Sequence, residues 1–312
     1  MPEITANFLA DWCEMQRTEL VSMGYTLKPS ETPEAISLAF YNVQRRVIPL
    51  RVRTIFQSRE LTCPYKHRAG LNLLLKRAAK GLDLRSHQSK GLLQPDYNDA
   101  LLNDWRIHHF HLGTTPERDA PDFVQRTGSV LFAYVTADEL FAVDVMEHGD
   151  WARQRLLEII HRNWPKLIEC YRPKGVLALE MTPSDDDIKK LRSAHVQSAT
   201  QIDGVVYCAP GGGYAMSGIS DEVVDQHDNA CRIFSGIQDY MTQNIDTLVK
   251  RARQDLGCAM TSPFHFKLKL VGADRVEVIE INSKATFIFP MNSSHDVLDM
   301  PVAPVPGYDP RA

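Results

Sequence analysis

The chain has 312 residues, of which 44% are hydrophobic and 24% are charged, and its formal net charge is −4. This composition excludes a disordered or fibrous protein and is typical of a globular protein with a sizeable core. Because the length exceeds that of one typical domain, we expect two domains or one large core with an added helical layer. The six cysteines are scattered without a CxxC pair, which argues against a disulfide framework or a zinc knuckle and favours reduced thiols.

The amino-terminal segment and the longest uncharged run bear on localisation. Residues 1–16 carry acidic residues and lack the positively charged start and apolar run of a secretory signal. The uncharged run over residues 204–220 is interrupted by glycines and is too short to span a bilayer. We therefore expect a cytoplasmic protein that does not insert into a membrane.

Positive charge is concentrated in one segment of the chain. Residues 40–90 contain twelve Lys and Arg residues against two acids, Glu60 and Asp83. A polyanion such as RNA would be attracted to a surface of this kind. The alternative is that the segment packs against an acidic part of the same protein or is a solvated surface without a partner.

Four elements are expected in the first third of the chain. Apolar spacing predicts helices over 4–23, from residue 32 onward and over 64–81, and alternation predicts a strand over 47–56. The strand and the helices around it present basic side chains that we predict to contact nucleic acid. These residues are Arg45, Arg46, Arg51, Arg53, Lys76 and Arg77.

The central stretch from Trp105 to Pro165 carries five of the eleven histidines beside the clearest strand signals. Alternation over 106–112 places His109 and His111 on one face and His108 on the other. The runs 130–135 and 140–146, joined by a short polar turn, predict a hairpin that ends at His148.

The remaining elements follow in order. We expect a helix ending before Pro165, a strand over 175–181, an acid-rich helix over 183–193, and a long helix from residue 220 to 256. A second hairpin around Gly272 and a proline-rich tail complete the chain.

A glycine loop precedes that long helix. Backbone N–H groups in such a loop can hold a phosphate at a helix amino terminus. The candidate phosphate-binding residues are Gly211, Gly212, Gly213 and Ser217. The stretch lacks the lysine of GxxxxGK[ST] and the spacing of GxGxxG, so a flexible turn is the alternative.

Helices and meandering strands mix without a βαβ rhythm, which favours an α+β fold with an antiparallel sheet core and helices packed around it. Two sub-domains are the expected division of that fold. The first, residues 1–172, holds the basic helical region and the hairpin. The second, residues 173–300, holds the glycine loop and long helix, and residues 301–312 form the tail.

The three imidazoles of His109, His111 and His148 can serve as acids and bases near neutral pH, or as metal ligands. An HxH pair with one distant histidine lacks the downstream glutamate of a common metal-binding pattern, so we predict no metal and no cofactor. For any single histidine, a structural role with satisfied hydrogen bonds is the commoner explanation.

The order of strand, loop with Arg126, hydrophobic hairpin VLFAYVTADELFAVDVM and His148 resembles the core of RelE/ParE-type toxins over residues 105–151. The resemblance implies a compact sheet whose basic and histidine side chains bind RNA and cleave it without metal through a 2′-hydroxyl. Arg126 resembles the arginine that precedes the first hairpin strand, and His148 the polar position at the end of the second. The chain departs from the family in its length, in its large carboxy-terminal part and in Gly149-Asp150-Trp151, which replace a tyrosine or arginine.

These observations predict a cytoplasmic RNA-acting toxin or antiphage-defence endoribonuclease. His109, His111 and His148 would act as acid and base, and Arg126 would stabilise the charge of the transition state. RNA is the expected partner. A cognate inhibitor protein and a second copy of the same chain are further expected partners. The alternatives are a non-catalytic regulatory protein that binds nucleic acid or a protein partner, and a nucleotide-binding enzyme that uses the loop 211–213.

Overall fold

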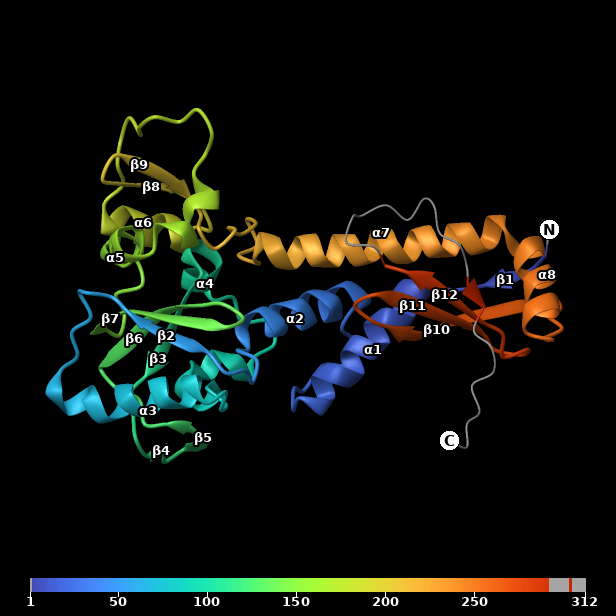
Figure 1. The fold of residues 1–312 in the computed structure, drawn as a ribbon, viewed down its shortest axis with the longest axis horizontal. Coiled ribbons are helices and arrows are strands. Elements are labelled where there is room, and N and C mark those ends of the chain that lie inside the picture. Colours follow the sequence, from blue (N-terminus) through green and yellow to red (C-terminus); the bar gives the residue numbers. More distant parts are fainter. Residues whose placement is uncertain (1, 292–302, 305–312) are drawn as a thin grey trace. The chain divides into compact units, whose positions relative to one another are not determined.

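Helices and mixed or antiparallel sheets make up the chain, which confirms the predicted α+β class (Figure 1). The structure is a computed structural model that describes residues 2–291 and 303–304. Within those residues, every helix is too short or too polar to cross a membrane.

The chain forms two compact units, one from residues 1–40 with 225–312 and the other from residues 41–224. This division differs from the predicted boundary after residue 172. The reason is a long-range pairing, because β1 (Ile4–Thr5) lies parallel to β10 (Phe264–Val271), and local sequence patterns do not report such a contact. The predicted tail, residues 301–312, lies outside the described residues except for Ala303 and Pro304.

The unit that contains both chain ends is built on a five-stranded sheet with the order β1-β10-β11-β12-β13. The predicted hairpin around Gly272 is confirmed, since β10 pairs antiparallel with β11. Helix α1 begins after Asn7, whose side chain accepts a hydrogen bond from the Ala10 backbone N–H. The predicted long helix is two helices, α7 and α8, and their apolar faces share one core with the sheet. The further bounds are β11 (Arg275–Glu280), β12 (Thr286–Pro290), β13 (Ala303–Pro304), α1 (Phe8–Ser22), α7 (Asp221–Gln243) and α8 (Ile245–Asp255).

The other unit is built on a four-stranded sheet with the order β2-β7-β6-β3. The strands are β2 (Thr54–Gln57), β3 (Ile107–His111), β6 (Ser129–Val135) and β7 (Glu139–Glu147). The predicted central hairpin is confirmed, because β6 and β7 pair antiparallel, while β2 lies parallel to β7. Strand β3 pairs with β6 at the edge of the sheet.

Helices cover both faces of this four-stranded sheet (Figure 1). On one face, α3 (Arg68–Ala79) buries Leu71 and Leu74 against Phe110 and Leu131. On the other face, apolar side chains of α4 (Ala100–Trp105) and α5 (Arg155–Asn163) share a core with Phe132. The smaller elements are α2 (Pro33–Arg46), α6 (Asp185–Ser193), β4 (Pro116–Glu117), β5 (Ala120–Val124), β8 (Ala199–Ile202) and β9 (Val205–Cys208).

Two predicted strands are wrong in whole or in part. The strand expected over 47–56 begins only at Thr54, and Val52 before it is exposed. The segment 175–181 is a loop, in which Leu177 is 89% exposed and Met181 is 82% exposed. In the described part of the chain this loop has no partner strand, so its apolar composition alone does not produce a strand.

Candidate functional site

Sheet register brings three histidines together. His109 and His111 lie on the same face of β3, as alternation predicts. His111 is paired with Val130 of β6, and Val130 is paired with Met146 of β7, so the end of β7 lies near His111. His148 follows that end, and its ring centroid lies 5.3 Å from that of His111 and 6.3 Å from that of His109.

A cavity of about 480 Å³ lies against this cluster. His109, His148 and Arg126 line it, so three of the four predicted catalytic residues share one cavity. Two aromatic side chains, Tyr97 and Trp151, also line it. The Trp151 ring centroid lies 4.5 Å from that of His109 and 4.8 Å from that of His148. The cavity therefore combines imidazoles, a guanidinium group and aromatic surface.

Another part of the cavity lining comes from α6 and the residues that follow it. Lys189, Arg192 and His195 line the cavity from there. Arg192 is held in place, because it donates hydrogen bonds to the buried carboxylate of Asp104 and to the backbone oxygen of Trp151. The sequence pattern did not identify these residues, since α6 was predicted only as an acid-rich helix.

His111 is fully buried, and its ring is fixed by one hydrogen bond. The backbone N–H of Thr127 lies 3.4 Å from its Nδ1, which therefore accepts and leaves the proton on Nε2. Burial and the positive charge of Arg126 lower the pKa of His111 to about 3. His111 is thus neutral at physiological pH and is not among the residues that line the cavity, so the structure does not favour its predicted role as an acid or base.

His109 and His148 differ in their surroundings. His109 is buried, and its Nδ1 has no hydrogen-bond partner in the described part of the chain. Burial lowers the pKa of His109, while the nearby carboxylate of Asp99 opposes that shift. His148 is exposed, and the pKa of its ring is lowered by partial burial and by Arg126. Both imidazoles are therefore available as proton acceptors near neutral pH.

Asp99 is the one carboxylate among the cavity residues, and sequence reasoning missed it. Its Oδ1 accepts a hydrogen bond of 3.1 Å from the backbone N–H of Leu102, so Asp99 caps the amino terminus of α4. An aspartate at the start of a helix is usually only a structural cap, so its position in the sequence did not indicate a functional role.

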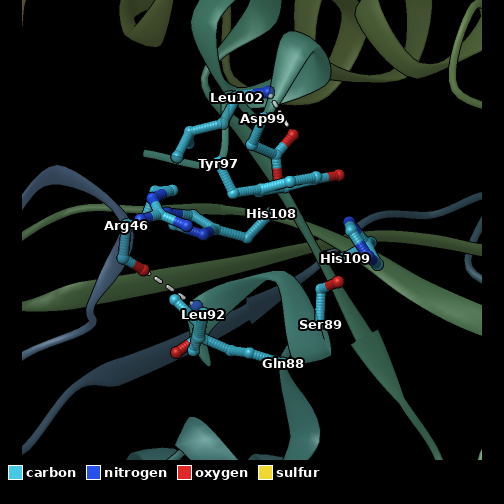
Figure 2. Close-up of a pocket in the computed structure, with 9 residues that line it drawn as sticks. All are labelled: Arg46, Gln88, Ser89, Leu92, Tyr97, Asp99, Leu102, His108 and His109. Carbon is cyan, nitrogen blue, oxygen red and sulfur yellow. Dashed lines mark hydrogen bonds between the residues drawn. The ribbon is translucent and has the colours of Figure 1, made fainter. Parts of the chain in front are cut away.

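A second, much smaller cavity of about 20 Å³ adjoins the first, and Figure 2 shows its lining. Tyr97, Asp99 and His109 line both cavities. His108 borders only the smaller one, where burial lowers its pKa to about 3. His108 is consequently a neutral, structural histidine.

Of the six arginine and lysine residues predicted to bind nucleic acid, Arg46 and Arg53 are buried, and the side chain of Arg45 is only 7% exposed. Arg45 forms an ion pair with Glu222 at 3.1 Å. Arg46 donates to backbone oxygens that include those of Gly91 and Gln94. Arg53 donates to the backbone oxygens of Thr136, Pro49 and Arg51. The prediction was wrong for these three, because buried carbonyl groups need donors and arginine supplies several.

The other three basic residues lie at the surface. Arg51 is exposed and forms an ion pair with Asp138 at 3.3 Å. Arg77 donates two hydrogen bonds to the backbone oxygen of Asp83. Lys76 is exposed on α3. Only this group remains available for the predicted contact with nucleic acid.

The glycine loop packs against α4, so its backbone N–H groups bond within the protein and are not presented to a ligand. The N–H groups of Gly211 and Gly213 donate to the backbone oxygens of Asp104 and Asn103 at 2.7 and 3.0 Å, and that of Gly212 donates within the loop at 2.8 Å. A Cβ on Gly211 would lie 2.4 Å from the Asn103 oxygen, so glycine is needed for close packing. Ser217 is exposed beyond these three glycines. The predicted phosphate cradle is therefore wrong.

No group of three or more His, Cys, Asp and Glu side chains within the described ranges has a geometry that could hold a metal ion. All six cysteines are free thiols. No family model, curated protein or solved structure matches the chain. Functional inference consequently rests on the chemistry of the cavity.

Proposed function

We propose that this chain is an endoribonuclease of the toxin or defence type, which cleaves single-stranded RNA through its own 2′-hydroxyl group. The observation that carries the proposal is the meeting of His109, His148 and Arg126 in one cavity beside Tyr97 and Trp151. The cavity volume of about 480 Å³ lies within the usual range for small-ligand pockets and suits a single nucleotide.

The charge balance of the cavity favours a phosphodiester. Arg126, Lys189 and Arg192 line it with positive charge, against the single carboxylate of Asp99. Because Arg192 already pairs with Asp104, Arg126 and Lys189 are the cations that a phosphate would meet. Tyr97 and Trp151 offer aromatic faces on which an unstacked base can lie, which is the usual mode of recognition of single-stranded RNA.

The chemistry requires a base, an acid and a stabilising charge. One imidazole removes the proton of the 2′-hydroxyl, the 2′-oxygen forms a bond to phosphorus, and the bond from phosphorus to the 5′-oxygen breaks. The other imidazole donates a proton to that 5′-oxygen. The products are a 2′,3′-cyclic phosphate and a 5′-hydroxyl end. Arg126 stabilises the charge on the phosphorane oxygens.

The test is incubation of the purified protein with a labelled, unstructured RNA oligonucleotide, with and without EDTA. We expect cleavage that survives EDTA, yields cyclic phosphate ends and is lost when the 2′-hydroxyl at the cleaved position is replaced by hydrogen. His109→Ala and His148→Ala should each slow cleavage at least a hundredfold, as loss of general acid–base catalysis does, by about 10²–10⁴. His265→Ala, on β10 of the other unit, is the matched control and should leave the rate unchanged.

Two results would overturn the proposal. Cleavage that requires added metal, or that proceeds equally on DNA, would assign the chemistry to a different mechanism. Intact RNA that is retained by the protein in a salt-sensitive manner would favour the alternative, a non-catalytic protein that binds nucleic acid.

A further inference from the structure

Helix α3 and the residues around it carry positive charge without neighbouring acids. Residues 61–82 contain five Lys and Arg residues and no Asp or Glu. The side chain of Arg77 is engaged with the backbone oxygen of Asp83. The other four are exposed and form no ion pair with any residue that the structure describes; they are Lys66, Arg68, Lys76 and Lys80.

The helix aligns most of these side chains on one side. Arg68, Asn72 and Lys76 follow one another at a spacing of four residues, and all three are exposed. Lys80, the residue at the carboxyl end of the helix, continues the row. At a rise of 1.5 Å per residue, the row from Arg68 to Lys80 is about 18 Å long.

The apolar side of α3 is covered by the four-stranded sheet (Figure 1). Leu71 and Leu74 are buried there, and a Cβ on Gly70 would overlap the backbone oxygen of Leu112, so the helix lies directly on its support. A surface helix binds a membrane through an exposed apolar face, which the sheet here already occupies. Helix α4, which lines the cavity, packs on the other face of the sheet, so α3 forms a separate surface.

An aromatic ring lies exposed just before the basic row. The side chain of Tyr65 is 86% exposed, and the guanidinium carbon of Arg68 lies 5.7 Å from the centre of its ring. A nucleic-acid base can stack on such a ring, and an adjacent arginine adds a cation–π contribution. A basic row beside an exposed aromatic ring is the combination with which proteins hold single strands.

We propose that this α3 surface binds a single strand of RNA. Phosphates lie along the basic row, a base stacks on the ring of Tyr65, and the amide of Asn72 bonds to a phosphate or sugar oxygen. An acidic protein segment would match the charge but would not require the aromatic ring. The choice of RNA rests on the proposed function, because the cavity accommodates one nucleotide and the strand beyond it needs a second surface. The residues of the α3 surface are Tyr65, Lys66, Arg68, Asn72, Lys76 and Lys80.

The test is the affinity of the protein for a labelled, unstructured 2′-O-methyl RNA, measured by fluorescence anisotropy at several salt concentrations. This probe has no 2′-hydroxyl, so the proposed reaction cannot cleave it. In the double variant Lys76→Ala/Lys80→Ala, the slope of log affinity against log salt should become less steep by about 1.4, since each phosphate contact on a single strand contributes about 0.7. Tyr65→Ala should weaken binding by about tenfold and leave the slope unchanged, because stacking releases no counterions.

A matched control separates local contacts from net charge. The double variant Lys250→Ala/Arg253→Ala removes two exposed charges from α8 in the other unit and should leave the slope unchanged. Circular dichroism checks that every variant is folded. The same slope in wild type and Lys76→Ala/Lys80→Ala, or equal changes in the two double variants, would overturn the proposal. Binding of polyglutamate or of anionic phospholipid vesicles more tightly than the RNA probe would also overturn it, in favour of a protein or a membrane.

Failure of this proposal is distinguishable from failure of the ribonuclease function. If the probe binds as expected and ordinary RNA stays intact, the α3 surface is supported and only the cleavage reaction is refuted. If ordinary RNA is cleaved while the α3 variants bind the probe as wild type does, the ribonuclease function is supported and the α3 surface is refuted.

Discussion

The pair Asp104–Arg192 holds one side of the cavity together, and its removal is expected to destabilise the chain strongly. Two guanidinium nitrogens of Arg192 lie 3.1 and 2.6 Å from Oδ2 of Asp104, and both side chains are buried. The guanidinium carbon lies 4.5 Å from the centre of the Trp105 ring. Arg192→Met keeps an unbranched apolar stem and removes the charge and every donor.

The expected loss of stability follows from the groups that Arg192→Met leaves without a partner. The Asp104 carboxylate stays buried without its cation, and the Trp151 carbonyl loses its donor. Breaking a buried pair by removing one partner typically costs about 3–5 kcal/mol. Burial already raises the pKa of Asp104 above its usual range in spite of Arg192, so in Arg192→Met this carboxyl takes up a proton more readily. Because a raised pKa favours the folded state at low pH, the variant should lose less stability at pH 5 than at pH 8.

The assay is urea unfolding at both pH values, followed by tryptophan fluorescence. A double-mutant cycle with Asp104→Leu gives the coupling, and the double variant should be more stable than Arg192→Met alone because no unpaired charge remains buried. A loss below about 1 kcal/mol in Arg192→Met at pH 8 would refute the reasoning, since that is the range of an exposed ion pair.

Three further outcomes are expected. Gly211→Ala should lower the free energy of unfolding by about 1–3 kcal/mol because its Cβ meets backbone atoms of α4. The Cβ of Gly212→Ala meets nothing within 4 Å, so this variant should lose only about 1 kcal/mol through the strain of its φ of +94°. Thermal unfolding compares the two variants. The pKa of His111 is lowered to about 3, so its contribution to stability is present above pH 6.5 and is lost as the pH falls from 6.5 toward 3. In this pH range, His111→Gln should reduce the slope of unfolding free energy against pH by about 1.4 kcal/mol per pH unit. An unchanged slope would contradict burial as the cause of the lowered pKa. Arg53→Ala should lower the melting temperature without changing RNA affinity, whereas Lys76→Ala should leave the melting temperature unchanged; a filter-binding assay at two salt concentrations checks the affinity.

Local patterns predicted the part of the site that lies on the sheet. Alternation placed His109 and His111 on one face, and the turn between β6 and β7 was readable from its polar residues. These features depend on neighbours in sequence, so the sequence alone identifies them. The approach of His148 to His111 was a prediction from the same hairpin, and the ring distances support it.

The remaining half of the cavity could not be predicted, because it comes from segments that meet only in the folded chain. Asp99 and Tyr97 precede α4, while Lys189 lies on α6, ninety residues later. The prediction of nucleic-acid-binding residues was wrong in part for a related reason. Charge counts cannot separate Arg51, which reaches solvent, from Arg53, which supplies hydrogen bonds to buried carbonyl groups.

The parallel pairing of β1 with β10 has a consequence for synthesis of the chain. Ribosomes release the amino terminus first, yet Ile4 and Thr5 find their partners only after residues 264 and 265 have emerged. Every residue of the cavity lies between positions 89 and 195 and is made well before that point. A nascent chain can therefore contain every residue of this cavity before β1 is able to pair with β10.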